Sequence, residues 1–67
     1  MFKYTLRKGD KGQEVARLQL KSGAKVDGNF GPATEQTVKD YQEDYNLTVD
    51  GIAGPQTLGS MGIEVFP

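Results

Sequence analysis

The chain has 67 residues with a formal net charge of −1, and it contains neither cysteine nor histidine. This length allows one small domain, and the composition excludes disulfides, thiolate or imidazole metal ligands and a Ser-His nucleophile. The chain has eight basic and nine acidic residues, so it lacks the basic excess that is typical of nucleic-acid-binding proteins. No segment predicts a signal peptide or approaches the roughly 20 apolar residues of a membrane span.

The first predicted helix covers residues 13–21. Val15 and Leu18 fall on one face of a segment that is otherwise rich in charged and amide side chains, with Leu20 close by. The Ser-Gly pair that follows at positions 22 and 23 ends this helix.

Two further helices are predicted to begin at a Gly-Pro pair. Proline at the first helical position loses no hydrogen bond, so Pro32 starts a helix that extends to Asn46, and Pro55 starts a shorter one that ends at Gly62. The apolar stripe of the longer helix consists of Thr34, Val38, Tyr41 and Tyr45.

A nine-residue segment occurs twice in the chain. VDGNFGPAT at 26–34 returns as VDGIAGPQT at 49–57, at a shift of 23 residues. Asp-Gly favours a tight turn in which the carboxylate accepts hydrogen bonds from nearby backbone N–H groups. The side chains expected to point inward from the two copies are Val26, Val49, Phe30 and Ala53.

The repeat extends upstream of the loop, because Leu18-Gln19 aligns with Tyr41-Gln42 at the same shift. One unit is therefore a helix that ends in an apolar-Gln pair, then a turn, then the Asp-Gly loop. This organisation indicates that the repeat builds the fold. The segments 2–6 and 62–66 both alternate with period two, which predicts either a small two-stranded ribbon or two extended arms that pack against the helices.

Fixed spacings run through most of the chain, and their members are Leu6, Gly9, Gly12, Val15, Leu18, Gln19, Asp27, Gly28, Phe30, Gly31, Thr34, Val38, Tyr41, Gln42, Leu47, Asp50, Gly51, Gly54 and Thr57. In these positions the chain resembles the peptidoglycan-binding domain family of bacterial and phage cell-wall hydrolases. That family has an L..G..G..V..LQ segment followed by two DG..G..T loops, and it usually has phenylalanine where Tyr41 stands here.

The resemblance implies an all-α fold, a small three-helix bundle that occupies residues 1–67 with its core at about 6–61. It implies a monomeric, non-catalytic module without cofactor or metal, which targets an attached peptidoglycan hydrolase, such as a muramidase or amidase, to the bacterial cell wall. We expect the chain to be the N-terminal module of a larger hydrolase. We also expect that it is made in the cytoplasm without a signal peptide and that it has no membrane or nucleic-acid partner. The alternative is a protein-interaction or structural module that kept the fold without wall binding.

Aromatic rings stack on sugar faces, while carboxylates and amides bond sugar hydroxyls and peptide groups. On this basis the candidate ligand-binding residues are Asp27, Asn29, Phe30, Thr34, Tyr41, Tyr45 and Asp50. The two aspartates could instead have a purely structural role, and Phe30 and Tyr41 could be core residues. Tyr45 could lie at the rim of the binding groove. The basic turn formed by Arg7, Lys8 and Lys11 either meets peptide carboxylates or is a solvated cluster.

Overall fold

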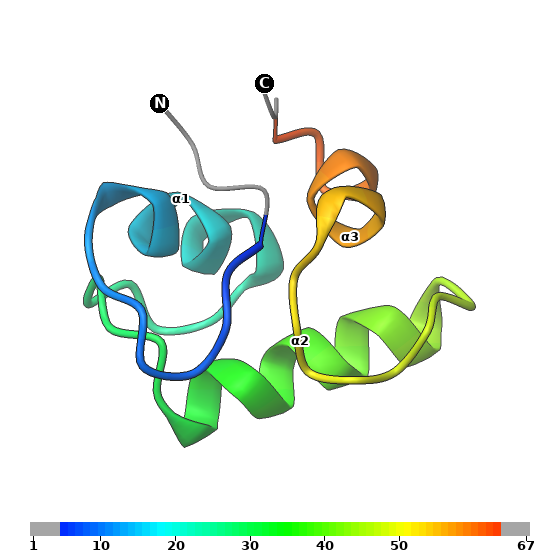
Figure 1. Cartoon of the computed structure of the whole chain (residues 1–67), viewed down its shortest axis with the longest axis horizontal. Coiled ribbons are helices and arrows are strands. Elements are labelled where there is room, and N and C mark those ends of the chain that lie inside the picture. Colours follow the sequence, from blue (N-terminus) through cyan, green and yellow to red (C-terminus); the bar gives the residue numbers. More distant parts are fainter. Residues whose placement is uncertain (1–4, 64–67) are drawn as a thin grey trace.

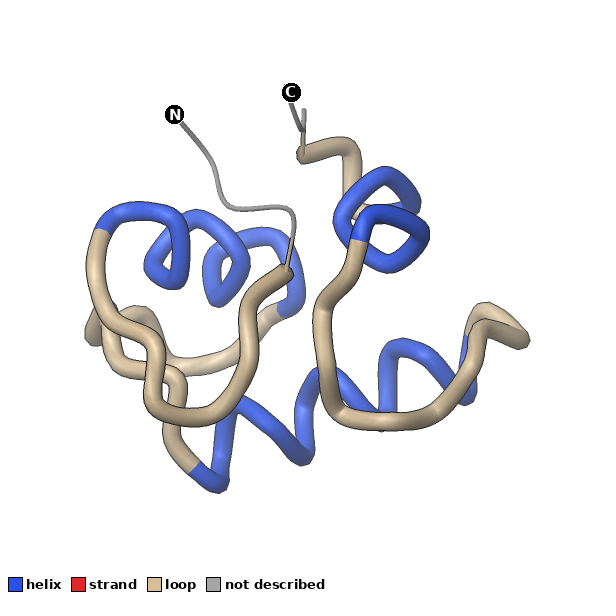
Figure 2. The backbone as a smooth tube through the Cα atoms, viewed as in Figure 1, coloured by secondary structure: helices blue, strands red, loops and turns tan. Residues whose placement is uncertain are grey.

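The computed structural model describes residues 5–63, which form three α-helices joined by loops (Figure 1). These helices are α1 (Gln13–Ser22), α2 (Pro32–Asp44) and α3 (Pro55–Ser60). In Figure 1, α2 runs along the bottom of the molecule, and α1 and α3 lie above its two ends. No strand occurs in the described part of the chain (Figure 2), so the predicted all-α class is confirmed.

The helices begin where the Gly-Pro pairs predicted. Pro32 and Pro55 occupy the first turns of α2 and α3, and Gly31 and Gly54 precede them in extended conformation. None of the three helices has a side-chain cap at its N-terminus. Proline therefore sets these starts through its fixed φ and its missing N–H.

The ends of α1 and α2 share one geometry at the 23-residue shift. Asn46 has a φ of 57°, and the N–H of Leu47 behind it donates to the carbonyl of Gln42 at 2.7 Å. In the first unit, Ala24 donates in the same way to the carbonyl of Gln19 at 3.0 Å. Both are Schellman-type ends that satisfy a free carbonyl of the last turn. Asn46 thus ends the helix as predicted, although α2 itself stops at Asp44.

The core draws on all three helices and on both Asp-Gly loops. Its buried apolar residues among those described are Leu6, Val15, Leu18, Phe30, Val38, Ala53, Leu58, Met61 and Ile63, with Tyr41 packed against them. Phe30 and Ala53 enter from equivalent loop positions, as predicted. The two repeat units therefore share a single core.

The segment before α1 fastens the two loops together. Leu6 exchanges backbone hydrogen bonds of 2.9 and 2.8 Å with Ala53 in the second loop. Further along, the N–H of Gly9 donates to the carbonyl of Phe30, and the N–H of Phe30 donates to the backbone carbonyl of Asp10, both at 2.9 Å. These bonds hold residues 6–10 between the two units.

The prediction that Val26 and Val49 point inward is wrong. Their side chains are 52% and 49% exposed. Each loop is held from inside through the backbone of the Asp-Gly pair that follows the valine, so the valine itself faces solvent. The terminal ribbon was predicted on 2–6 and 62–66, and most of those residues lie outside the described part of the chain.

Candidate functional site

The first Asp-Gly loop is organised around the side-chain amide of Gln19, which is fully buried. Its Nε2 donates to the Asp27 carboxylate at 2.8 Å, to the Asn29 carbonyl at 2.9 Å and to the Thr34 hydroxyl at 3.0 Å. Its Oε1 accepts from the backbone N–H groups of Asp27 and Gly28 at 3.0 and 2.9 Å. One side chain thus fixes the loop on both sides of its turn.

The second loop repeats this arrangement around Gln42, which is 1% exposed. Its Nε2 donates to Asp50 and to the Ile52 carbonyl at 2.9 Å each, and to the Thr57 hydroxyl at 3.2 Å. Its Oε1 accepts from the N–H groups of Asp50 and Gly51 at 3.1 and 3.0 Å. The two units share a hydrogen-bond frame as well as a sequence.

This frame sets the charge state of the two loop carboxylates. The N–H of Asn29 and then the Gln19 amide lower the pKa of Asp27 below its ordinary value of 3.8. The N–H of Ile52, followed by the Gln42 amide, lowers the pKa of Asp50 in the same way. Both carboxylates are therefore stable anions and hydrogen-bond acceptors, whereas a general acid needs a raised pKa.

The structure divides the candidate residues of the first loop into interior and surface. Phe30 is 2% exposed and Thr34 is 5% exposed, so both belong to the core and the loop frame. Asp27 is exposed but engaged by Gln19 and by the N–H of Asn29. The Asn29 side chain is exposed, while its carbonyl belongs to the frame.

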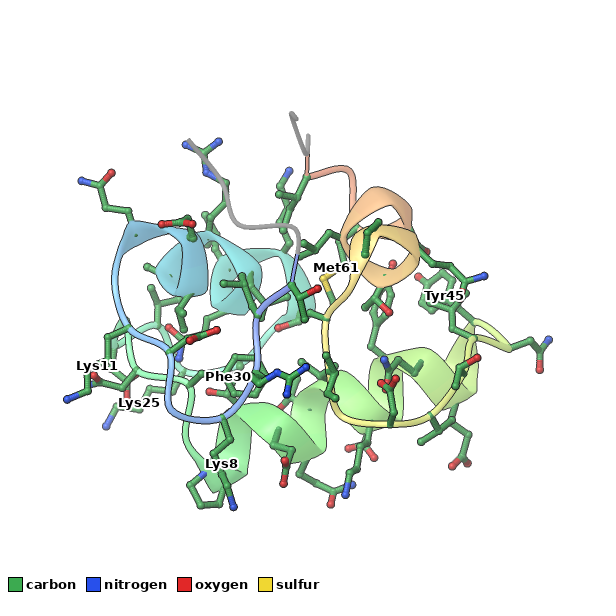
Figure 3. All side chains as sticks on the ribbon, in the orientation of Figure 1. Lys8, Lys11, Lys25, Phe30, Tyr45 and Met61 are labelled. Carbon is green, nitrogen blue, oxygen red and sulfur yellow. The ribbon has the colours of Figure 1, made fainter. Side chains whose placement is uncertain are left out.

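Tyr41 and Tyr45 form a stacked pair at the carboxyl end of α2. Their ring centroids are 4.3 Å apart and the ring planes are inclined by 21°. Tyr41 is half-buried, and its hydroxyl shares a hydrogen bond of 2.9 Å with the Ser60 hydroxyl of α3. Tyr45 is 58% exposed, and Figure 3 shows it at the end of α2. The pair offers one aromatic ring to solvent on a fixed support.

The candidate residues do not meet at one point. Asn29 lies just before α2 and Tyr45 just after it, and 13 helical residues at about 1.5 Å each separate them by roughly 20 Å. Asp50 belongs to the second loop, whose Gly51 lies against the α2 side chains Glu35 and Lys39. The molecule therefore has two separate exposed surfaces, one at each end of α2.

Basic side chains gather at the first loop. The turn that holds Lys8 and Lys11 pairs with the first loop through a bridge between Lys11 and Asn29. Lys25 lies close enough to Asp27 to help lower its pKa. Figure 3 shows the three lysines at the same end of the molecule. The predicted basic turn also included Arg7, but Arg7 lies close enough to Asp50 in the second loop to help lower the pKa of that carboxylate. The prediction missed Lys25, which joins Lys8 and Lys11 only through the fold.

The structural role of the two glutamines is not predicted from the sequence. The sequence aligns them at the 23-residue shift, but it does not indicate that either side chain is buried. A glutamine retained in both units beside a buried apolar residue was the available signal. In the described range, no group of three or more His, Cys, Asp or Glu side chains could hold a metal, and no helix is long and apolar enough to cross a membrane.

Comparison with known proteins gives a consistent result. The sequence profile of a family described as a putative peptidoglycan binding domain matches residues 12–61. A zinc D-Ala-D-Ala carboxypeptidase of Streptomyces albus G is 42% identical over 65 residues, an alignment that covers 85% of this chain and 26% of the carboxypeptidase.

Two solved structures have a fold similar to that of this chain. The SleB N-terminal domain has a TM-score of 0.86 and 32% identity, and the match covers 92% of this chain and 94% of that one. The Burkholderia AP3 phage endolysin has a TM-score of 0.84 and 38% identity, with 90% of this chain and 25% of the endolysin covered. The chain spans about a quarter of the length of the carboxypeptidase and of the endolysin.

Proposed function

The chain belongs to the peptidoglycan-binding domain family, and we propose that it is the module that holds an attached hydrolase against the bacterial cell wall. The observation behind this proposal is the family match over residues 12–61, which includes both Asp-Gly loops and their glutamines. The carboxypeptidase and the phage endolysin each contain a similar segment within a much longer chain. Tethering multiplies avidity by about 10² to 10⁴ when both parts engage the same polymer.

The chemistry of the chain supports a binding role without catalysis. Its composition lacks histidine and cysteine, the commonest general base and the strongest nucleophile. The pKa values of Asp27 and Asp50 are lowered, which is opposite to the raised pKa that a general acid needs. We therefore propose that bond cleavage is performed by the attached domain, of the muramidase, amidase or peptidase class.

The exposed ring of Tyr45 is the proposed contact for the glycan strand. Sugar rings have apolar faces, and an aromatic ring that is already fixed loses little conformational entropy when it binds one. The Tyr41 ring stacks on the Tyr45 ring with a centroid distance of 4.3 Å, and the Tyr41 hydroxyl shares a hydrogen bond with the Ser60 hydroxyl. These two contacts restrict the orientation of the Tyr45 ring. At the other end of α2, the exposed amide of Asn29 is a proposed contact for peptide groups.

Co-sedimentation of the fluorescently labelled chain with protein-free sacculi tests this proposal, with chitin and cellulose as controls. Retention by sacculi is expected. Tyr45→Ala is expected to weaken retention about two- to twelvefold, since an aromatic contact contributes about 0.5–1.5 kcal/mol. Tyr45→Phe keeps the ring and should bind like the parent. Failure of the parent to bind any sacculus type would refute wall binding, and equal binding by Tyr45→Ala would remove Tyr45 from the site.

A further inference from the structure

A pair of hydroxyl groups borders the aromatic stack at the carboxyl end of α2. The Tyr41 hydroxyl lies 2.9 Å from the hydroxyl of Ser60, the last residue of α3, and the contact is exposed. A hydroxyl can donate one hydrogen bond and accept two. The bond between Tyr41 and Ser60 uses one donor and one acceptor, so the pair keeps one O–H donor and three acceptor positions that water or a ligand can use.

The fold does not require this pair. At the 23-residue shift Tyr41 corresponds to Leu18, which is fully buried and has no hydroxyl, so the first unit builds the same helix end from an apolar side chain. An exposed hydrogen bond between two hydroxyls also adds little stability, because both groups bond to water in the unfolded chain. Thr37 corresponds to Ser60, but its hydroxyl donates to the Ala33 carbonyl of its own helix at 3.1 Å. The hydroxyl pair therefore belongs to the second unit alone.

The hydroxyl pair adjoins the ring that is proposed to contact the glycan. The Tyr41 ring, which carries one of the hydroxyls, is stacked on the Tyr45 ring at a centroid distance of 4.3 Å. Tyr45 and Ser60 are both exposed, at the end of the molecule where Figure 3 shows Tyr45. An apolar ring and a neutral donor and acceptor pair are thus presented to solvent side by side.

This combination fits an N-acetylated sugar better than a plain sugar or a peptide. A sugar ring has an apolar face that can lie on the Tyr45 ring. An acetamido group adds an N–H donor and a carbonyl acceptor, and the hydroxyl pair can bond to both. A sugar without the acetamido group lacks the amide, whereas a peptide has amides but lacks the apolar ring face.

We propose that the hydroxyl pair of Tyr41 and Ser60 binds the acetamido groups of the wall glycan and gives this site a preference for N-acetylated sugars. The inference rests on the proposed wall-binding function, in which Tyr45 contacts the glycan strand. One sugar lies on the Tyr45 ring, and the acetamido group of the next sugar bonds to the hydroxyl pair. Tyr41 and Ser60 thus determine which polysaccharide is bound, while Tyr45 supplies a contact that sugars of either kind can use.

The test is a titration of the ¹⁵N-labelled chain with two neutral trisaccharides of the same linkage, followed by NMR. Triacetylchitotriose carries acetamido groups, and cellotriose has hydroxyls in their place. Saturable shifts are expected at the amides of Tyr45 and Ser60. The parent is expected to bind triacetylchitotriose about two- to twelvefold more tightly than cellotriose, the range for one neutral hydrogen bond. The same preference predicts that chitin retains the chain better than cellulose does in the sedimentation assay.

Tyr41→Phe separates the hydroxyl from the aromatic stack. Phenylalanine keeps the ring that packs on the core and on Tyr45, so this variant is expected to fold and to bind cellotriose like the parent. Its affinity for triacetylchitotriose should fall about two- to twelvefold, which removes most of the preference. Ser60→Ala should have the same effect. Thr37→Ala is the matched control, because it removes the hydroxyl at the corresponding position of the first unit, and it should keep the preference of the parent.

Each possible result supports or overturns the proposal. A preference for triacetylchitotriose that Tyr41→Phe and Ser60→Ala both reduce, and that Thr37→Ala keeps, would support it. Equal affinity of the parent for the two trisaccharides, no saturable shift with either, or an unchanged preference in Tyr41→Phe or Ser60→Ala would overturn it. If sacculi retain the parent chain in any of those cases, this inference fails and the wall-binding function stands. If the preference is found while sacculi retain nothing, the wall-binding function fails and the sugar site stands.

Discussion

The buried glutamine of the first unit provides the most direct test of how this fold is held together. Gln19→Met keeps the length and flexibility of the side chain but removes all of its hydrogen-bonding groups. The N–H groups of Asp27 and Gly28 and the carbonyl of Asn29 would lose a partner at 3.0, 2.9 and 2.9 Å. Methionine has no N–H donor to replace Nε2 of Gln19, and its thioether sulfur is too weak an acceptor to replace Oε1, which accepts from two N–H groups.

The expected loss can be estimated from the two N–H groups, because the Asn29 carbonyl still accepts from the Gly31 N–H at 3.1 Å. An unsatisfied buried polar group costs about 1–3 kcal/mol, and the lower value applies here because water reaches the exposed side of the loop. The loss is then about 2 kcal/mol for the two groups. A domain of this length has a free energy of unfolding of roughly 3–10 kcal/mol, at about 0.05–0.15 kcal/mol per residue. Gln19→Met is therefore expected to remove about a fifth or more of the free energy of unfolding.

Urea unfolding monitored by far-UV circular dichroism measures this loss. The matched control is Gln36→Met on the exposed face of α2, where the side chain donates only to Asp40 at 3.0 Å. That pair contributes about 0.2–0.5 kcal/mol, so the control should unfold almost like the parent. If Gln19→Met and Gln36→Met shift the midpoint equally, the reasoning that the amide holds the loop is refuted.

Two further predictions concern the loops. The folded pKa values of Asp27 and Asp50 are lowered from 3.8, so the unfolded chain binds more protons between the folded and unfolded pKa values. The free energy of unfolding should be level above about pH 5 and fall as the pH drops through 3.8 and below. In thermal melts, the double variant Asp27→Asn with Asp50→Asn should lose less stability over this pH range than the parent. An unchanged dependence of the melting temperature on pH would contradict this reasoning. Gly51→Ala should destabilise more than Gly28→Ala in urea unfolding. Both residues have a positive φ, 74° and 76°, but a Cβ on Gly51 would lie 3.0 Å from Glu35 Cγ, whereas on Gly28 it would lie 3.6 Å from the nearest carbonyl oxygen. The positive φ costs alanine about 1–2 kcal/mol at either site, and equal losses would show that the Glu35 contact relaxes freely.

Local chemistry made the helix boundaries predictable. A Gly-Pro pair restricts the backbone at the start of a helix, and Asn46 tolerates the positive φ that ends one, so both signals act within a few residues. The inward position of Phe30 followed from its size and its place in the loop. Such features depend on neighbours in the chain and can be read without knowledge of the fold.

The buried glutamines and the outward valines depended on tertiary structure. A glutamine on a helix is normally solvated, and Gln19 is buried only because an entire loop supplies donors and acceptors around its amide. The same contacts turn Val26 outward, against its hydrophobicity. The contact between the loop and α1 has the same origin, since Leu20 and Val26 line one shallow hollow only when the loop folds back along the helix.

The duplication explains how a domain of this size can support two different surfaces. The core and the two glutamine frames hold the fold, and both use positions that are equivalent in the two units. Several exposed positions differ between the units: Leu20 corresponds to Glu43, and Lys25 corresponds to Thr48. The aromatic pair exists only in the second unit, since Ser22 stands where Tyr45 would be in the first. Because the two surfaces lie roughly 20 Å apart at the ends of α2, well beyond the range in which substitutions usually couple, changes at one should leave the other intact. The proposed contacts Asn29 and Tyr45 therefore lie where the two units differ, whereas the glutamine frames that stabilise the fold lie where the units agree.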